Sequence, residues 1–353
     1  MGSPLRMCES ESGAAKVFRG VLRPDGRAGT RNYLAVLVAS NCAASAARFT
    51  AELFDDHQLA SWPNVDGVLA LTHDIGCGME MTGEPMDLLR RTLSGTIRNP
   101  NVAGAVVLAL GCERNNIRLL FEQEGLQEGP LLKPIVLQES GGTMGAVQAA
   151  KDALLRMLPL ANEAQRVDVP LSQLTVGLQY YNNRTSARPS GAEIFVRDAA
   201  QALSTAGVRL VLADQDPFAL QETRHVVYGV YAQAARRYGE SAITSGVTLM
   251  QCPVIPDIAT TGQIAAGATI ILSATEMSGD CCTSVAPCVR VSTSSTATTR
   301  VGVDTDLAES EGGRDENNIL SMVCRYASGQ RTVSEKNGMN DTQFNPWPIG
   351  VLV

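Results

Sequence analysis

Aromatic residues are scarce in this chain: they make up 5% of its 353 residues, although hydrophobic residues together reach 44%. The interior must therefore consist mainly of Ala, Val, Leu and Ile, which suits buried parallel strands covered by helices. No regular internal repeat is present, which argues against a solenoid. At this length, two domains packed against each other are favoured over a single core.

Long apolar runs are missing as well. No stretch approaches the roughly 20 residues that a membrane-spanning helix requires. Met1 to Lys16 is polar and rich in small residues, and it lacks the apolar core of a signal peptide. We therefore expect a cytoplasmic protein that does not contact a membrane.

Basic clusters are absent, and the net charge is −7. This argues against nucleic acid as a partner, because phosphate backbones are bound by clustered Lys and Arg. No Gly-x-Gly-x-x-Gly segment follows an expected strand, so a nucleotide-binding oxidoreductase is disfavoured. The nine cysteines are scattered along a long chain, which favours free thiols or metal ligands over a disulfide framework.

Alternating apolar runs and helix-like segments predict the fold class. Continuous apolar runs such as Tyr33 to Ala39 and Ala103 to Leu110 indicate buried strands, each followed by a polar loop and a segment of helical composition. We therefore expect an α/β protein made of two packed α/β domains with mainly parallel sheets. The expected ranges are a disordered tail at 1–17, an N-terminal domain at 18–168 that carries most site loops, and a C-terminal domain at 169–353.

Polar loops follow four of the expected strands. Parallel strands place such loops at one edge of a sheet, where ligands bind in open α/β folds. The loops therefore predict one shared site, and they are Ser40 to Cys42, His73 to Gly78, Gly111 to Asn115, and Gln138 to Thr143.

The segment from His73 to Gly78 brings an imidazole and a thiol into one Gly-rich loop. His73 and Cys77 are suited to bind iron or zinc, and His73 can also transfer protons near neutral pH. The alternative is a tight turn in which Cys77 is a small buried residue, because one His and one Cys do not define a metal site.

Two further loops offer carboxylates. Glu113 follows Cys112 directly after a strand and suits a base or a ligand, although pairing with Arg114 or capping of the next helix explains it equally well. The loop from Gln138 to Thr143 contains glycines that let backbone N–H groups approach an anion, with a helix dipole behind them. Ordinary helix capping is the alternative for this loop.

Two other clusters have less specific spacing. Arg23, Arg27 and Arg31 are suited to clamp a carboxylate, and a solvated turn is the alternative. Cys281, Cys282 and Cys288 lie close together in sequence, but their spacing fits no standard zinc motif.

Taken together, these segments resemble the large domain of the altronate and galactarate dehydratases, a family that also includes sulfolactate sulfo-lyase. The resemblance covers most of residues 18 to 353. The segments that carry it are Leu22 to Arg27, Gly29 to Tyr33, Asn41-Cys42, His73 to Gly78, Leu110 to Glu113, Gln138 to Thr143, and Phe344 to Gly350.

The resemblance implies an iron-dependent hydro-lyase that eliminates water from an aldonic or aldaric acid, such as altronate or galactarate, to give a 2-keto-3-deoxy acid. Such a reaction needs a base, a cation beside the substrate carboxylate, and an acid. The implied cofactor is Fe2+ or another divalent metal. The implied roles are acid/base catalysis by His73, Glu113 and Glu139, metal binding by His73, Cys77 and Cys112, and substrate binding by Arg23, Arg27, Arg31, Asn41, Gly141, Gly142 and Thr143.

The chain departs from the family pattern in its second half. Tyr180 to Arg184 stand where the family has Cys-Gly-Gly-Ser-Asp, and a stretch rich in Asn, Pro, Gly and Lys is missing between Arg237 and Gly246. Cys281 to Cys288 keep only part of a Cys-Lys-Pro-Ala-Pro segment. The alternatives are a sulfolactate-type lyase, or a non-catalytic paralogue that binds a hydroxy acid or a partner subunit. We expect a separate small subunit to supply the family's N-terminal domain, and homo-oligomers are left open.

Overall fold

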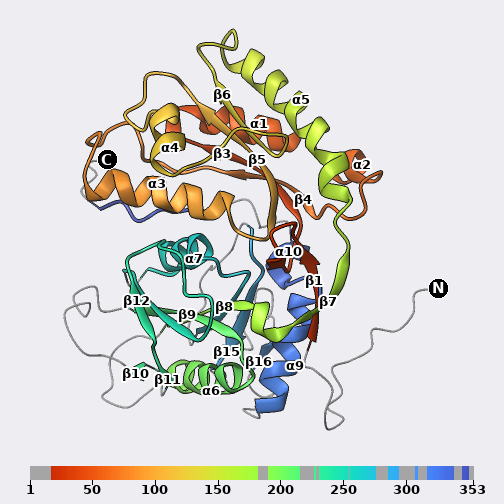
Figure 1. The fold of residues 1–353 in the computed structure, drawn as a ribbon, viewed down its shortest axis with the longest axis vertical. Helices are drawn as coiled ribbons and strands as arrows, with labels where there is room; N and C mark the ends of the chain where they lie inside the picture. Colours follow the sequence, from red (N-terminus) through yellow and green to blue (C-terminus); the bar gives the residue numbers. More distant parts are fainter. Residues whose placement is uncertain are drawn as a thin grey trace.

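The computed structural model describes residues 17–181, 190–214, 226–227, 230–253, 255–275, 285–293, 307–308, 316–337 and 344–349. Most of the expected tail, at residues 1–16, lies outside these ranges. The chain forms two lobes, each built on a parallel sheet (Figure 1). The prediction of two packed α/β units with mainly parallel sheets is therefore confirmed.

The first lobe contains a four-stranded parallel sheet in the order β4-β3-β5-β6. Its strands are almost continuously apolar because helices cover both faces. The bounds are β3 (Tyr33–Val38), β4 (Gly67–Leu71), β5 (Val102–Ala109) and β6 (Leu132–Val136).

Helices cover both faces of this sheet. The helices α1 and α5 pack on one face, and α3 and α4 pack on the other. The chain runs from β3 outward to β4, then crosses back to β5 on the far side of β3, so the strand order reverses between β3 and β5. Such a switch point is where open α/β sheets bind ligands. The helix bounds are η1 (Asn41–Ala43), α1 (Ala44–Glu52), α2 (Asp56–Leu59), α3 (Glu84–Ile97), α4 (Ile117–Gln123) and α5 (Thr143–Asn162).

The second lobe contains a seven-stranded parallel sheet in the order β12-β13-β9-β8-β14-β15-β16. Helices α6 and α9 cover one face and α7 covers the other, on the side of the first lobe (Figure 1). The strands are β8 (Thr175–Tyr181), β9 (Arg209–Asp214), β12 (Ala234–Arg236), β13 (Val247–Gln251), β14 (Ile270–Thr275), β15 (Cys288–Ser292) and β16 (Leu307–Ala308). The remaining elements are η2 (Leu171–Gln173), α6 (Gly191–Thr205), the paired strands β10 (Val226–Val227) and β11 (Val230–Tyr231), α7 (Pro256–Ala265), α9 (Glu316–Ala327) and α10 (Val333–Lys336).

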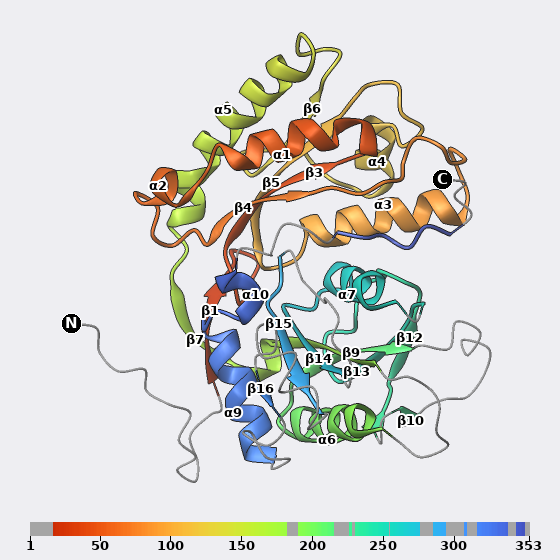
Figure 2. The same ribbon diagram turned by 180° about the vertical axis from the view of Figure 1, so that it is seen from behind.

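A small antiparallel sheet joins the lobes. It has the order β2-β1-β7, with β1 (Val17–Leu22), β2 (Ala28–Gly29) and β7 (Arg166–Pro170). Phe18 of β1 and Val169 of β7 belong to the core of the second lobe, and α9 packs beside β1 (Figure 2). The first strand of the chain thus contributes to the second lobe, and the segment predicted as the domain boundary is itself a strand.

The two lobes meet where α3 crosses α7. Gly95 of α3 approaches so closely that a Cβ at this position would lie 2.3 Å from the carbonyl oxygen of Ala265. Beside this crossing, the Asn99 amide donates to the carbonyls of Ile264 and Ala268 at 2.8 and 2.9 Å. Buried amide-to-carbonyl bonds of this kind fix one geometry between the lobes, because leaving them unmade is costly.

Among the described helices, none is long and apolar enough to cross a membrane.

Candidate active site

The four predicted site loops lie at one edge of the first sheet. Each follows the carboxyl end of a strand, and the four strands are parallel neighbours. Leu137 and Gln138 donate backbone N–H bonds to Ala109 and Leu110 at 2.8 and 3.1 Å, which ties the β5 and β6 loops together. The convergence that the sequence predicted is therefore present in the structure.

Three thiols emerge at this edge, one from each of three adjacent loops. Cys42 follows β3, Cys77 follows β4 and Cys112 follows β5, and all three are exposed. The Cys42 thiol donates to the Oδ1 atom of Asn41 at 3.6 Å and is also in hydrogen-bond contact with Cys77. The contact with Cys42, aided by the nearby Cys112 and Glu113, raises the pKa of the Cys77 thiol. Cys77 is thus not the buried cysteine of a tight turn.

The backbone holds the thiol-bearing loops in place. Asn41 donates its N–H to Ile75 at 3.1 Å, and Asn115 donates its N–H to Gly76 at 3.0 Å. The buried Asn115 amide also donates to the carbonyl oxygen of Ala39 at 2.9 Å, so one residue contacts two neighbouring loops. Gly76 has φ of +100° and a Cβ there would lie 2.6 Å from the same carbonyl oxygen, so glycine is required.

His73 is buried beneath these loops rather than directed into the site. Its Nε2 atom lies 3.0 Å from the carbonyl oxygen of Val38, and its Nδ1 atom accepts the N–H of Ile75 at 3.3 Å. Burial lowers its pKa to about 4. Both ring nitrogens are therefore occupied by the backbone, which disagrees with the prediction that His73 binds metal or transfers protons.

Glu113 is a buried carboxylate beside the thiols. Its Oε2 atom accepts the N–H of Gly111 at 2.6 Å, while its Oε1 atom has no hydrogen-bond partner among the described residues. It neither pairs with Arg114 nor caps α4, because Asn116 is the cap of that helix. The hydroxyl of Ser40 is likewise buried and unpartnered within the described part of the chain. Both oxygens therefore keep hydrogen-bonding capacity that the described protein groups do not use.

The loop after β6 has the geometry expected of an anion site. Gly141 and Gly142 have positive φ values of 79° and 87°, both are exposed, and Gly142 opens the 20-residue helix α5 without a side-chain cap. The first N–H groups of α5 are therefore free of side-chain capping and carry the positive end of the helix dipole. Glu139 in this loop is exposed and pairs with Arg118 at 3.3 Å.

The three arginines that were predicted to bind substrate lie at the opposite end of the sheet, before β3. Arg31 is 2% exposed and its guanidinium donates to Glu335 at 2.5 and 2.7 Å, and to three backbone carbonyls. Arg23 donates to the Pro100 carbonyl and to Asn32, and burial lowers its pKa to about 10. Arg27 pairs with Asp25. These contacts disagree with a substrate-clamping role.

The remaining candidate residues are buried, lie outside the described residues, or are exposed at the edge of the loops. Cys252, Cys288 and Cys324 are buried, as structural cysteines are. Cys281, Cys282 and the segment 182–184 lie outside the described residues. Asn41 and Thr143 are exposed at the loop edge, where a substrate role remains a prediction.

The C-terminal segment packs beneath the site. Phe344 is buried in the same core as α3, and its ring centroid lies 6.0 Å from that of His73. Figure 1 shows this segment running alongside α3. Trp347 contacts Tyr238 of the second lobe edge-on, with ring centroids 5.7 Å apart. Residues 344–349 therefore pack on both lobes, and Phe344 contacts the His73 ring.

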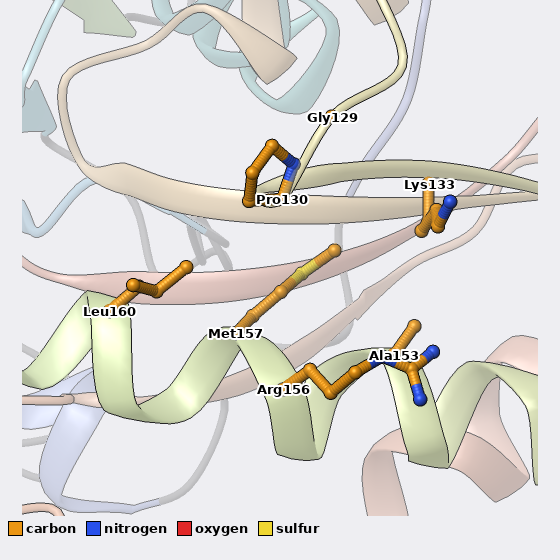
Figure 3. A pocket seen from close by; sticks show the side chains of 7 residues that line it. All are labelled: Gly129, Pro130, Lys133, Ala153, Arg156, Met157 and Leu160. Atoms are coloured by element: carbon orange, nitrogen blue, oxygen red, sulfur yellow. The ribbon is translucent and has the colours of Figure 1, made fainter.

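A shallow cavity of about 230 Å³ lies elsewhere on the first lobe, between the β6 edge and the later turns of α5 (Figure 3). The residues of α5 that line it begin at Ala153, ten residues after Thr143, where the helix begins. That separation is about 15 Å along the helix axis. This cavity is therefore separate from the thiol-bearing edge.

Three residues of the predicted site loops had been given no individual role from the sequence, namely Ser40, Cys42 and Asn115. Cys42 occupies the same post-strand position as Cys77 and Cys112, so its placement was the available signal for a third thiol. Ser40 and Asn115 gave no such signal, because their roles depend on contacts between loops that are far apart in the sequence.

The donor set suits a thiophilic metal. Cysteine thiolates bind iron and zinc well, and the unpartnered oxygens of Ser40 and Glu113 border the same edge. Thiols, a buried carboxylate and a helix N-terminus thus lie together at the switch point of this sheet, which is where open α/β sheets bind ligands.

Both lobes match models of one enzyme family. Residues 20–162 match the D-galactarate dehydratase/altronate hydrolase second domain, and residues 230–352 match the D-galactarate/altronate dehydratase C-terminal domain. The chain belongs to the D-galactarate dehydratase/altronate hydrolase family, as its sequence motifs had indicated.

Curated relatives agree with this assignment. The altronate dehydratase of Bacillus subtilis is 31% identical over 46% of this chain and 32% of its own length. The (2R)-sulfolactate sulfo-lyase subunit beta of Chromohalobacter salexigens is 28% identical over 63% of this chain and 50% of its own length. The altronate dehydratase of Escherichia coli is 26% identical over 44% of this chain and 30% of its own length. The chain thus spans a third to a half of the length of these relatives.

Proposed function

We propose that the chain is a lyase that eliminates water from an aldonic or aldaric acid and gives a 2-keto-3-deoxy acid. The observation that carries the proposal is that residues 20–162 and 230–352 match two domain models of the same dehydratase family. Altronate and galactarate are the first substrates to test, because the family is named after them. The net charge of −7 and the absence of a basic cluster favour a small anion over nucleic acid.

The substrate carboxylate is assigned to the N-terminal end of α5. The N–H groups of Gly141 and Thr143 offer donors to an anion without the repulsion of a nearby capping side chain, while the Gly142 N–H donates to the Leu137 carbonyl at 2.9 Å. The glycines leave open space, since a Cβ at Gly141 or Gly142 would contact nothing within 4 Å. A carboxylate can therefore approach the backbone closely.

Proton transfer is assigned to the two carboxylates of the neighbouring loops. Glu139 is exposed on the same loop as the proposed carboxylate site, which suits a base that removes the proton beside the substrate carboxylate. Glu113 is buried with one free oxygen and is suited to hold a proton for the departing hydroxide. His73 is assigned a supporting role, because both of its ring nitrogens bind the backbone.

A metal is part of the proposal. Iron held by the thiols of Cys77 and Cys112, with Cys42 beside them, would supply positive charge that stabilises the enediolate as the proton leaves. The protein side chains described above do the binding, the positioning and the proton transfer. We also propose a cytoplasmic location and a partner subunit, because one relative is the subunit beta of a (2R)-sulfolactate sulfo-lyase.

The test is an assay for 2-keto-3-deoxy acid formation over a panel of aldonic and aldaric acids, with anaerobically purified protein. Glu139→Gln should lower kcat about 100-fold or more, because it removes a general base while keeping the side-chain shape. Glu128→Gln is the matched control: it removes an exposed carboxylate that pairs with Lys133 away from the site, and activity should not change. Unchanged activity in Glu139→Gln would contradict the assignment of the base.

A sulfolactate-type lyase is the second candidate. It is favoured by the match to the sulfo-lyase subunit beta, which covers more of this chain than either altronate dehydratase does. The same panel therefore includes a sulfonated hydroxy acid, with sulfite release as the readout. Binding of a hydroxy acid with no turnover in any assay would instead support a non-catalytic paralogue.

A further inference from the structure

The cavity between β6 and the later turns of α5 has an apolar wall and a volume of about 230 Å³. Ala153 and Met157 are 3% and 1% exposed, and both belong to the core between α5 and the first sheet. Figure 3 shows Met157 and Leu160 pointing from α5 toward the strand, with Pro130 and Lys133 on the opposite side. At about 30 Å³ for each water molecule of the liquid, the space suits a compact ligand of roughly eight non-hydrogen atoms.

The edge strand beside this cavity is closed to further strand pairing. Leu132 exchanges two backbone hydrogen bonds with Gly129, at 2.9 and 3.3 Å. Pro134 has no N–H to donate, and the Val136 carbonyl accepts from the N–H and the hydroxyl of Ser140, at 3.0 and 2.8 Å. Edge strands whose backbone groups are used in this way do not template another strand. The cavity is therefore not one half of an interface formed by strand addition.

Two cations border the apolar wall. Arg156 is exposed, and its guanidinium makes no hydrogen bond or ion pair with any residue of the described ranges. Lys133 pairs with Glu128, but both side chains are half-exposed and such pairs are weak. An ammonium has three donors, so Lys133 can also bind a second acceptor. Two positive groups at one cavity favour an anionic ligand, although the net charge of the chain is −7.

We propose that this cavity binds a small monocarboxylate with a compact apolar body, of the kind that benzoate represents. The carboxylate accepts from Arg156 in the two-point geometry that a guanidinium favours, and from Lys133. The apolar body covers Met157 and Leu160 and removes their surface from water. A polyhydroxy acid would leave hydroxyl groups unpaired against this wall, so the cavity selects against the substrates proposed for the thiol-bearing edge. The site does not depend on the dehydratase assignment.

The experiment is an NMR titration of the full chain with isotope-labelled methionine methyl groups. Met157 lines the cavity and reports on it, whereas Met144 lies beside the proposed carboxylate site at the start of α5. The spectrum of Met157→Leu assigns the first signal, and that of Met144→Leu assigns the second. Benzoate is expected to shift the Met157 signal saturably, with a dissociation constant in the millimolar range or tighter.

Three comparison ligands separate the parts of the proposed recognition. Benzamide keeps the ring and lacks the charge, inorganic phosphate keeps charge and lacks the apolar body, and gluconate replaces the apolar body with hydroxyl groups. Each is expected to act on the Met157 signal at least about tenfold more weakly than benzoate. A shift of the Met144 signal by gluconate alone would support two separate sites.

Variants of α5 test the individual contacts. Arg156→Gln is expected to weaken benzoate binding at least about tenfold, because it removes the two-point contact. Leu160→Gln is expected to weaken it severalfold, because it makes the wall polar. Lys151→Gln is the matched control: it removes a positive charge from another side of the same helix, outside the cavity lining. Its affinity should stay within about twofold of the wild type, because exposed charges at a distance are screened.

Equal benzoate affinity in Arg156→Gln and the wild type would overturn the proposal. Phosphate or gluconate acting on Met157 as strongly as benzoate would also reject it, since the cations would then attract any anion. Benzamide acting as strongly would mean that the apolar wall works alone, and no response to any of the four ligands would mean a solvated surface only. These ligand comparisons use the wild-type protein, so they do not depend on the folding of a variant.

Discussion

Arg31 shows how a motif suited to binding substrate serves structure instead. Its planar guanidinium does bind a carboxylate in two-point fashion, but the carboxylate is that of Glu335 in α10. The sequence indicated the chemistry of this side chain correctly and could not indicate its partner, because the two residues are about 300 positions apart. The guanidinium of Arg31 thus holds the start of the first lobe to α10 of the second.

Breaking this buried ion pair should be costly. Glu335→Gln is expected to lower the free energy of unfolding by about 3–5 kcal/mol, because it leaves the Arg31 charge buried without its partner. Urea unfolding followed by circular dichroism measures the change. Glu240→Gln, which removes only half-exposed pairs with Arg236 and Arg237, should change stability by less than about 1 kcal/mol. Equal effects in both variants would contradict the structural role of the pair.

The same pair predicts a pH dependence. Burial acts to raise the pKa of Glu335, but the hydrogen bond and charge of Arg31 outweigh it, so the folded pKa lies below the ordinary value of 4.5. The contribution of this carboxylate is therefore fully present above about pH 4.5 and is lost as pH falls through the lowered value. Glu335→Gln should lack this component of the pH profile.

The buried imidazole of His73 should give the free energy of unfolding a second pH-dependent contribution, at higher pH than that of Glu335. Its folded pKa of about 4 lies below the ordinary value of 6.5, because burial disfavours the imidazolium. Its contribution is present above pH 6.5 and is lost as pH falls from 6.5 toward 4, by up to about 3 kcal/mol. Unfolding titrations of the wild type and His73→Asn check this, and a wild-type stability that is flat between pH 6.5 and 4 would contradict the buried neutral imidazole.

Among the elements, the close crossing of α3 and α7 makes the sharpest prediction. Gly95→Ala should destabilise the protein by about 1–3 kcal/mol, because the new Cβ meets the backbone of Ala265 and must push the helices apart. The midpoint of thermal unfolding measures it. Gly129→Ala is the matched control, since a Cβ there meets nothing within 4 Å and no positive φ forbids it. A Gly95→Ala protein as stable as the control would mean that the crossing tolerates expansion.

Elements with strong local patterns were predictable, and those defined by distant partners were not. The runs of β3 and β5 are apolar throughout and short, as strands buried on both faces must be, and α5 has a long helical composition. By contrast, β1 contains Arg19 and Gly20 and lacks a continuous apolar run, and its partner β7 lies far along the chain, so no local pattern indicates this strand. Helix α7 is buried on nearly all sides, so its sequence lacks the polar face that marks a helix.

At the scale of the molecule, the position of the site was more predictable than its chemistry. Parallel topology alone placed the four loops on one edge, and the switch point between β3 and β5 selects the same edge. Which groups face outward depended on packing: it buried His73 and exposed Cys42, and no local pattern distinguishes these outcomes. The order of the strands therefore determines where the site lies. The packing beneath it determines which side chains are available as donors.

The small sheet between the lobes also sets an order of events during synthesis. Strand β1 leaves the ribosome first, pairs with β7 only after the whole first lobe has been made, and packs on α9 only near the end of the chain. At about 5–20 residues per second, the interval from β1 to α9 is roughly 15 to 60 seconds. During that time Phe18 has no core to enter, so the nascent chain carries an exposed apolar edge that a chaperone is well placed to cover.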